Sequence, residues 1–349
     1  ILFILLETLK NHVAMEKTSG DEVAYLGLTP LLVNLLKTDL FKEIVLLLIH
    51  RLAKSCELRD AFVHMGGMNV LVPMLSDRTK DYFLDVVTII NRMCDKSRLS
   101  QVAVAELGGL RLLVQILRTD NNEPESSSKI AESDPLHDPS CKIRLMVTSC
   151  LKNLLECSDN VTCATNYGAV EALLPYCDSP SCAMVENVVT SVLYLSNIYA
   201  NREQIAQCSS LIDLLDCEHS SIQEIVCNIL SNVSMSSQCQ EILLQNGAYS
   251  KLQNQLESDN QLLSLYAQMA LNHFKHLDVG SLKRRALELI KNSKIDFEQK
   301  KKDIETQYVR KYEAMINRGS MKASSKLTAY DSLLRSEERR VGKECRSRW

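Results

Sequence analysis

Apolar residues recur along most of the chain at the three- and four-residue spacing of a buried helical stripe, starting with Leu2, Leu5, Leu6 and Leu9. Within these segments one short pattern returns, in which an apolar residue and any second residue are followed by Asn or another polar residue. We name the polar residues of this series the ladder, and its members are Asn11, Arg51, Arg92, Asn153, Asn197, Asn232 and His273. Successive members lie 35 to 44 residues apart, except for one gap of 61 that contains a polar insert. A period near 40 residues in a helix-prone chain predicts an array of stacked helical repeats.

Glycines form a second series with the same period. Gly66, Gly108, Gly168 and Gly247 each lead into an apolar run, and Gly27 and the weaker Ser209-Ser210 complete the series. A positive φ angle costs little only at Gly, so a Gly between two helices lets the second start almost perpendicular to the first. Together the two series predict a repeat of a short helix, a Gly turn, a second helix ending in an Asp/Ser loop, and a third helix that carries the ladder residue.

This combination resembles the armadillo repeat over roughly residues 1–276. The resemblance implies an all-α fold, a right-handed α-solenoid of about six to seven three-helix repeats whose third helices line a concave groove. In armadillo proteins the ladder Asn holds the backbone of an extended peptide, and the resemblance carries this role to the four Asn residues of the ladder. At Arg51, Arg92 and His273 the chain departs from the pattern, which favours selective contacts with acidic or polar groups of a partner.

Three segments interrupt or follow the array. Residues 121–140 contain three Pro and five acidic residues without an apolar cluster, which predicts a disordered surface loop. This insert is either a tolerated insertion or a loop that is phosphorylated or binds a partner. Residues 281–318 are highly charged and predict a helix or the start of a coiled coil, followed by a linker at 319–334. Residues 335–349 read as the translation of a sequencing adapter and are excluded from functional reasoning; we expect a fragment at both ends.

Charge and composition narrow the class of partner. Residues 1–282 carry 21 basic and 33 acidic side chains, whereas residues 283–326 carry 13 basic and 6 acidic ones. An acidic array does not favour nucleic acid as a partner, and few aromatic residues are present to stack on bases. No apolar run approaches the roughly 20 residues of a membrane-spanning helix, so no membrane association is predicted.

The sequence offers no pattern for catalysis or for a metal. The twelve cysteines before residue 335 include no CxxC pair, and examples such as Cys150, Cys208 and Cys227 fall at apolar helix positions. Small buried thiols indicate a reducing compartment, which we expect to be the cytoplasm with the nucleus as an alternative. A phosphate-binding Gly loop, a nucleophile elbow and an HExxH pattern are all missing from the sequence. We therefore predict no enzyme activity, no catalytic or metal-binding residue and no cofactor.

The prediction that remains is a protein–protein interaction scaffold or adaptor that binds a partner polypeptide along the groove. The alternative is a regulatory armadillo region of a larger protein, either an enzyme or a meiotic telomere-attachment protein. A nuclear-import adaptor like importin-α is disfavoured, because that family places Trp four residues before the ladder Asn to stack on Lys side chains. The equivalent positions here are Glu7, Leu47, Thr88, Ser149, Leu193, Asn228 and Met269.

Overall fold

The computed structural model describes residues 2–15, 20–38, 41–122 and 139–275, all within the first of two units into which the chain divides, Ile1–His276. These residues form α-helices and short 3-10 helices, and none of them is in a strand. The insert is shorter than predicted, because its first two and last two residues belong to flanking helices. Its remaining part, the charged segment, the linker and the terminal tail lie outside the described residues.

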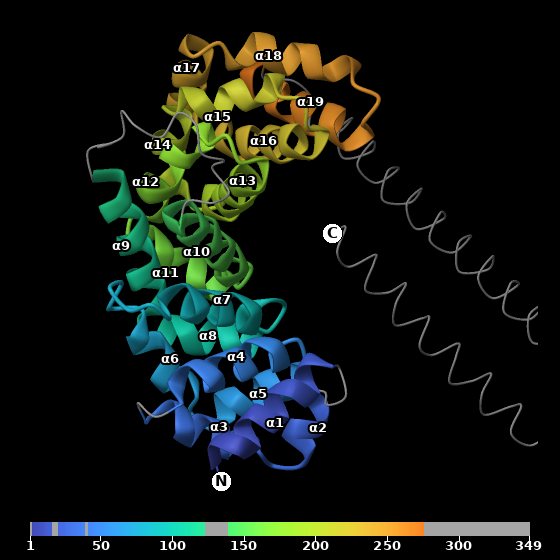
Figure 1. Ribbon diagram of the computed structural model, residues 1–349. Coiled ribbons are helices and arrows are strands. Elements are labelled where there is room, and N and C mark those ends of the chain that lie inside the picture. The colour runs from blue at the N-terminus through green and yellow to red at the C-terminus, as the bar shows by residue number, and fades with distance from the viewer. Residues whose placement is uncertain (1, 16–19, 39–40, 123–138, 276–349) are drawn as a thin grey trace, which may run out of the picture. The chain divides into compact units, whose positions relative to one another are not determined.

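The helices follow one another as a single third helix and then six triplets (Figure 1). The first helices are α2 (Gly20–Tyr25), α5 (Cys56–His64), α8 (Arg98–Glu106), α11 (Ser158–Asn166), α14 (Arg202–Ala206) and α17 (Ser237–Gln245). The second helices are α3 (Thr29–Leu36), α6 (Met68–Met74), α9 (Gly109–Asn122), α12 (Ala169–Leu173), α15 (Ser209–Asp213) and α18 (Ala248–Asn254). The third helices are α1 (Leu2–Ala14), α4 (Lys42–Leu52), α7 (Phe83–Cys94), α10 (Pro139–Leu155), α13 (Cys182–Ser196), α16 (Ser220–Val233) and α19 (Gln261–Lys275).

Four short 3-10 helices join these elements. The second helices of the last three triplets continue as 3-10 turns, and the first helix of the fifth triplet begins with one. They are η2 (Leu174–Asp178), η3 (Tyr199–Asn201), η4 (Leu214–Asp216) and η5 (Gln255–Glu257).

Glycine makes the turn between the first and second helix in five of the six triplets, as predicted. Gly27, Gly66, Gly108, Gly168 and Gly247 all adopt φ angles between 68° and 79°. Helices α8 and α9, which meet at Gly108, are bent by 73° relative to each other. The fifth triplet turns differently, because Gln207 and Cys208 keep negative φ angles of −75° and −81° there. This turn needs no Gly, and Cys208 lies in it rather than in a helix as we had expected.

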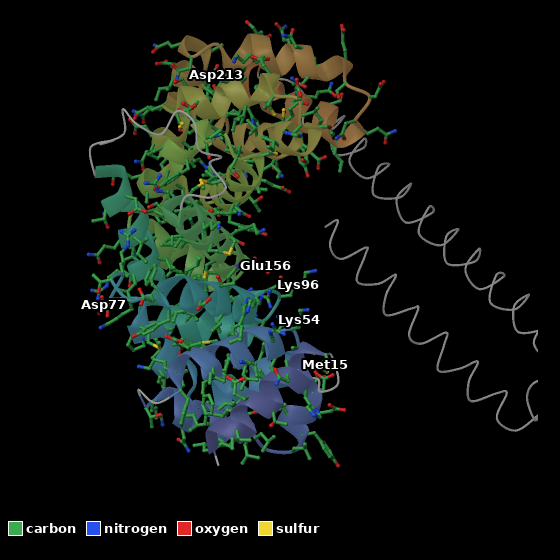
Figure 2. All side chains as sticks on the ribbon, in the orientation of Figure 1. Met15, Lys54, Asp77, Lys96, Glu156 and Asp213 are labelled. Atoms are coloured by element: carbon green, nitrogen blue, oxygen red, sulfur yellow. The ribbon has the colours of Figure 1, made fainter. Side chains whose placement is uncertain are left out.

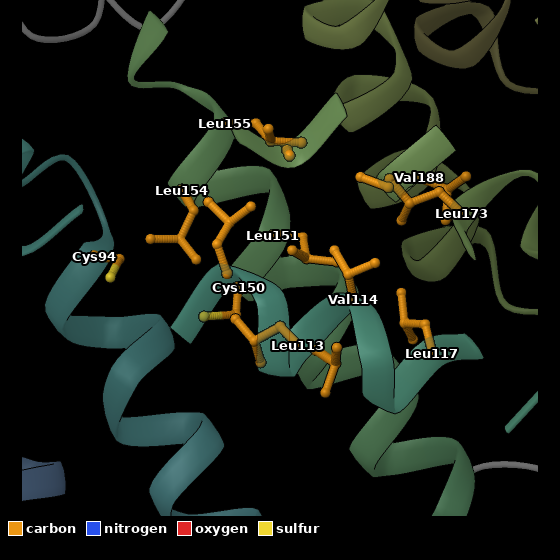
Figure 3. Close-up of a cluster of buried hydrophobic side chains, with 14 of the residues drawn as sticks. Cys94, Leu113, Val114, Leu117, Cys150, Leu151, Leu154, Leu155, Leu173 and Val188 are labelled. Carbon is orange, nitrogen blue, oxygen red and sulfur yellow. The ribbon is translucent and has the colours of Figure 1, made fainter. Parts of the chain in front are cut away.

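The third helices are packed on more than one side. In α7 both Val86 and Val87, and then Ile89 and Ile90, are fully buried. One stripe packs on the helices of the same repeat and the other on the adjacent third helices, α4 and α10. Buried side chains form one cluster from the first to the last repeat. Figure 3 shows this cluster around α10, where side chains of α7, α9, α12 and α13 meet.

Amide side chains, three of them buried and one half-buried, close the C-terminal ends of the third helices α7, α10, α13 and α16. The last carbonyl groups of a helix have no partner within that helix and must find donors elsewhere when they are buried. Gln101 donates to Cys94 O at 2.9 Å, Asn160 to Leu154 O at 2.9 Å, Asn201 to Leu195 O at 2.8 Å, and Gln240 to Ser234 O at 2.7 Å. In each case the donor belongs to the first helix, or the turn that begins it, of the repeat that follows.

This closure gives a first prediction. Asn160 is 4% exposed and its amide donates to Leu154 O and, at 3.3 Å, to Gln101 O. Replacing Asn160 by Ala leaves buried carbonyls without donors, and we expect a loss of about 1–3 kcal/mol in the free energy of unfolding. Urea denaturation of the full chain measures it. The control Asn166→Ala, at the exposed end of the same helix, should change stability by less than about 0.5 kcal/mol; equal effects would contradict the prediction.

Candidate partner-binding face

The third helices pack in chain order from α1 to α19, so the side of each that is not covered faces solvent next to its neighbours. We define the third-helix face as the surface made by the ladder residues together with the residues four positions before them. Every one of these side chains is exposed or half-buried. The face therefore consists of two parallel rows, one of mostly polar ladder residues and one of mixed chemistry.

Four ladder residues bond to the preceding third helix. Their donor or acceptor contacts are Arg92 Nη1 to His50 O at 2.8 Å, Asn153 Nδ2 to Asn91 Oδ1 at 2.8 Å, Asn232 Nδ2 to Ser196 Oγ at 2.9 Å, and His273 Nδ1 with Ser234 Oγ at 2.8 Å. All four are half-buried. Some of the hydrogen-bonding groups of the ladder side chains thus join neighbouring repeats. Each Asn keeps its side-chain oxygen free of hydrogen bonds within the described residues.

The other three ladder residues are exposed. Asn197 donates only to carbonyl groups of its own helix, to Tyr194 O at 3.1 Å and Leu193 O at 3.4 Å. The side chains of Asn11 and Arg51 have no hydrogen-bond or ion-pair partner among the described residues. These three side chains are the most accessible polar groups of the ladder.

Asn91 is a polar residue beside this face whose hydrogen bonds the ladder pattern did not predict. Its Nδ2 donates to Ser149 Oγ at 3.1 Å, and its Oδ1 accepts from Asn153 Nδ2. It thereby joins α7 to α10. The pattern assigned the ladder position of α7 to Arg92, which is correct in register. Three of the four bonded ladder residues reach back to the residue just before the preceding ladder position, whereas His273 reaches Ser234, and this regularity would have identified Asn91.

Two half-buried histidines lie on or beside the face. Burial lowers the pKa of His50, and the nearby cations Arg92, Arg51 and Lys54 lower it further while Asp85 opposes them. Burial also lowers the pKa of His273, against a backbone hydrogen bond at Ser231 that raises it. Both imidazoles are therefore neutral at pH 7 in the folded chain.

The described residues contain no group of three His, Cys, Asp or Glu side chains placed to hold a metal ion. The twelve described cysteines are free thiols, of which six are buried and three exposed. Burial raises the pKa of the Cys227 thiol to about 12, so this group stays protonated and unreactive. Among the described helices none alone is long and apolar enough to span a membrane; the bent pair α8 and α9 passes on length and composition when taken together.

The chain was compared with known proteins. No protein-family model and no curated protein sequence matches it. An engineered protein, structural-genomics target OR497, superposes with a TM-score of 0.61 at 17% identity over 73% of this chain, which spans 60% of that protein. A designed armadillo repeat protein in complex with the peptide (KR)4 gives a TM-score of 0.56 at 17% identity over 70% of this chain and 98% of the other. The chain has the armadillo-repeat fold.

A third armadillo neighbour is a natural one. A chain from a structure of the phosphorylation-switched interaction between cadherin and beta-catenin matches with a TM-score of 0.62 at 16% identity. The match covers 77% of this chain and 48% of that one. The armadillo array of residues 2–275 is thus an all-α solenoid, as the two phased series predict, and its third helices occupy the places that the ladder assigns them.

The lowered pKa values of His50 and His273 predict a loss of stability in mild acid. Because the folded pKa lies below the ordinary value of 6.5, the unfolded chain binds more protons as the pH falls through and below that value. The two neutral imidazoles therefore contribute their full stabilisation of the folded chain above pH 6.5. This stabilisation is lost as the pH falls from 6.5 to the lower pKa values of the folded chain. The urea midpoint of unfolding should fall between pH 7.5 and 5.5, and the midpoint of the variant His50→Asn/His273→Gln should fall less steeply. The exposed His64 is the control, and a slope changed equally by His64→Asn would contradict this assignment.

Proposed function

We propose that the chain is a non-enzymatic scaffold or adaptor that binds an extended segment of a partner polypeptide along its third-helix face. The observation that carries the proposal is the common register of the ladder, whose side chains follow one another across adjacent third helices through hydrogen bonds such as that of Asn153 with Asn91. Designed armadillo neighbours that bind peptides, including the complex with (KR)4, support the same use of the fold. The cadherin–beta-catenin neighbour supports a protein as the partner.

Spacing is compatible with an extended peptide. Packed helices lie about 8–10 Å apart, and an extended chain advances about 3.3 Å per residue. Each ladder residue would therefore meet every second or third peptide unit of a bound segment. Asn side chains such as Asn197 and Asn232 have a donor pair and an acceptor, which match the N–H and C=O groups of a peptide backbone.

Side chains beside the ladder would set the selectivity. The row four positions earlier contains Leu47, 37% exposed, and the half-buried Leu193 and Met269, with no aromatic residue. This row therefore offers no aromatic ring on which a Lys side chain of a peptide could stack, which argues against an importin-like preference for basic peptides. The free thiols of the described residues support a reducing compartment, the cytoplasm or the nucleus.

Selection of peptides from a random display library by the full chain tests this function. We expect selected peptides to lose binding by tenfold or more, roughly 1.4 kcal/mol, when Leu47→Glu/Asn197→Glu places on the third-helix face two charges that a bound peptide would have to cover. The matched control is Leu244→Glu/Asn254→Glu, two exposed positions on α17 and α18.

Fluorescence anisotropy with labelled peptides measures the dissociation constants. Equal losses in both double variants, or retention of binding by the face variant, would move the binding site to another surface.

A further inference from the structure

Charge is distributed unevenly along the third-helix face. Taken together, the third helices α4, α7 and α10 contain six basic and two acidic residues, although residues 1–282 as a whole are acidic. In contrast α13 and α16 contain no basic residue and one Glu each. The basic residues of α4, α7 and α10 are Lys42, Arg51, Arg92, Lys142, Arg144 and Lys152, and the acidic ones are Glu43 and Asp85.

Four cations gather where α4 and α7 end, and we define Arg51, Lys54, Arg92 and Lys96 as the basic cluster. Arg92 reaches across to α4, where its Nη1 donates to His50 O at 2.8 Å. Arg51, Lys54 and Arg92 are all close enough to the His50 ring to lower the pKa of that imidazole. Lys96 follows α7 in a left-handed backbone conformation with φ of 55°. Figure 2 shows Lys54 and Lys96 on the same side of the array.

Within the part of the chain that the structure describes, no ion pair neutralises the cluster. The side chains of Arg51, Lys54 and Lys96 are exposed and make no hydrogen bond or ion pair within the described residues. Arg92 uses only one of its N–H groups, on a backbone carbonyl. Asp85 is the one carboxylate that acts against these cations at His50. Beside Lys96, a cleft of about 300 Å³ is lined also by Arg98, Gln101 and Glu156, and Glu156 already accepts from Gln101 Nε2 at 3.2 Å.

We propose that the basic cluster is a subsite for two acidic side chains of the bound peptide, spaced two or three residues apart. The spacing follows from the separation of neighbouring third helices, about 8–10 Å, and the advance of an extended chain, about 3.3 Å per residue. Guanidinium groups bind carboxylates in a two-point geometry, and Arg51 and Arg92 supply one on each helix. This inference rests on the proposed function and names the chemical class of segment that the N-terminal half of the face prefers.

A nucleic acid is the other polyanion that cations attract. Base recognition in single strands depends on aromatic stacking, and no aromatic residue occurs among the ladder residues or in the row beside them. The net acidic array also repels a long phosphate backbone beyond the cluster. A short acidic peptide meets the cluster without this repulsion, so a peptide is the ligand that the charges favour.

The test compares peptides selected from a random dodecapeptide library by three forms of the full chain. We expect the wild-type chain to enrich peptides with Asp or Glu pairs two or three residues apart, and Arg51→Gln/Lys54→Gln to lose this enrichment. The matched control Lys37→Gln/Arg111→Gln removes the same two charges from exposed positions of α3 and α9 and should keep it. For one selected peptide, replacing both acidic residues by Gln should raise the Kd roughly tenfold, and the raise should shrink at high salt.

Each outcome decides between the two proposals. Selected peptides without acidic pairs, or acidic and Gln peptides that bind equally, overturn the subsite but leave the third-helix face standing if Leu47→Glu/Asn197→Glu still abolishes binding. Peptides whose dissociation constants are unchanged in both Leu47→Glu/Asn197→Glu and Arg51→Gln/Lys54→Gln overturn the face and the subsite together. Tighter binding of a single-stranded oligonucleotide than of the acidic peptide, lost in Arg51→Gln/Lys54→Gln, assigns the cluster to nucleic acid and overturns the proposal.

Discussion

The array depends on the way in which the third helices α7, α10, α13 and α16 end inside the stack. Their last carbonyl groups accept amide donors from other helices, and a buried carbonyl without a donor costs free energy comparable to a lost hydrogen bond. The donor comes from the following repeat, as in the bond from Asn160 to Leu154 O or from Asn201 to Leu195 O. A repeat alone would leave both its apolar stripe and these carbonyls open to water. Stability is therefore shared between neighbours, and each repeat orders the one before it.

Hydrogen bonds between neighbouring repeats also occur on the third-helix face. A ladder side chain such as Asn232 bonds first to the preceding helix, through Ser196 Oγ, and only its remaining donor and acceptor face solvent. Structural and binding roles of the ladder are thus not alternatives. A residue that is half-buried and fixed by one hydrogen bond is already ordered, so contact with a ligand costs it little further side-chain entropy. The exposed Arg51 lacks such a bond and would be ordered only by the ligand.

Much of this fold could be read from the sequence because two of its physical requirements leave periodic marks. Five of the six turns between first and second helices use positive φ, which marks residues such as Gly66 and Gly108, and a helix buried on two sides has an apolar segment such as that of α7. The fifth turn escaped this reading because Gln207 and Cys208 make it with ordinary backbone angles. The end of α9 was placed too early, because polar residues at a helix end resemble the loop that follows.

The helix-closing amides could not be recognised so easily, although they also recur. Gln101, Asn160, Asn201 and Gln240 differ in residue type and in position within the first helix, and an amide at the start of a helix reads as an ordinary cap. Likewise the ladder identified positions on the third-helix face, but the sequence did not reveal which of them bond within the array. That division depends on whether a side chain reaches the preceding third helix, as Asn153 does and Asn197 does not.

Because the stack needs only the buried stripes and the closing amides, the exposed rows are free to differ from repeat to repeat. In α4 and α7 they carry Arg51 and Arg92, whereas in α13 and α16 they carry Asn197 and Asn232. A charged surface attracts over a distance of about a Debye length, near 8 Å at physiological salt, while amide and apolar groups act only in contact. Under the proposed function, one end of the face would capture an acidic segment and the other would hold an uncharged one. A segment with acidic residues at one end only would match both the basic and the uncharged half of the face. A uniformly charged segment would match only one of the two halves.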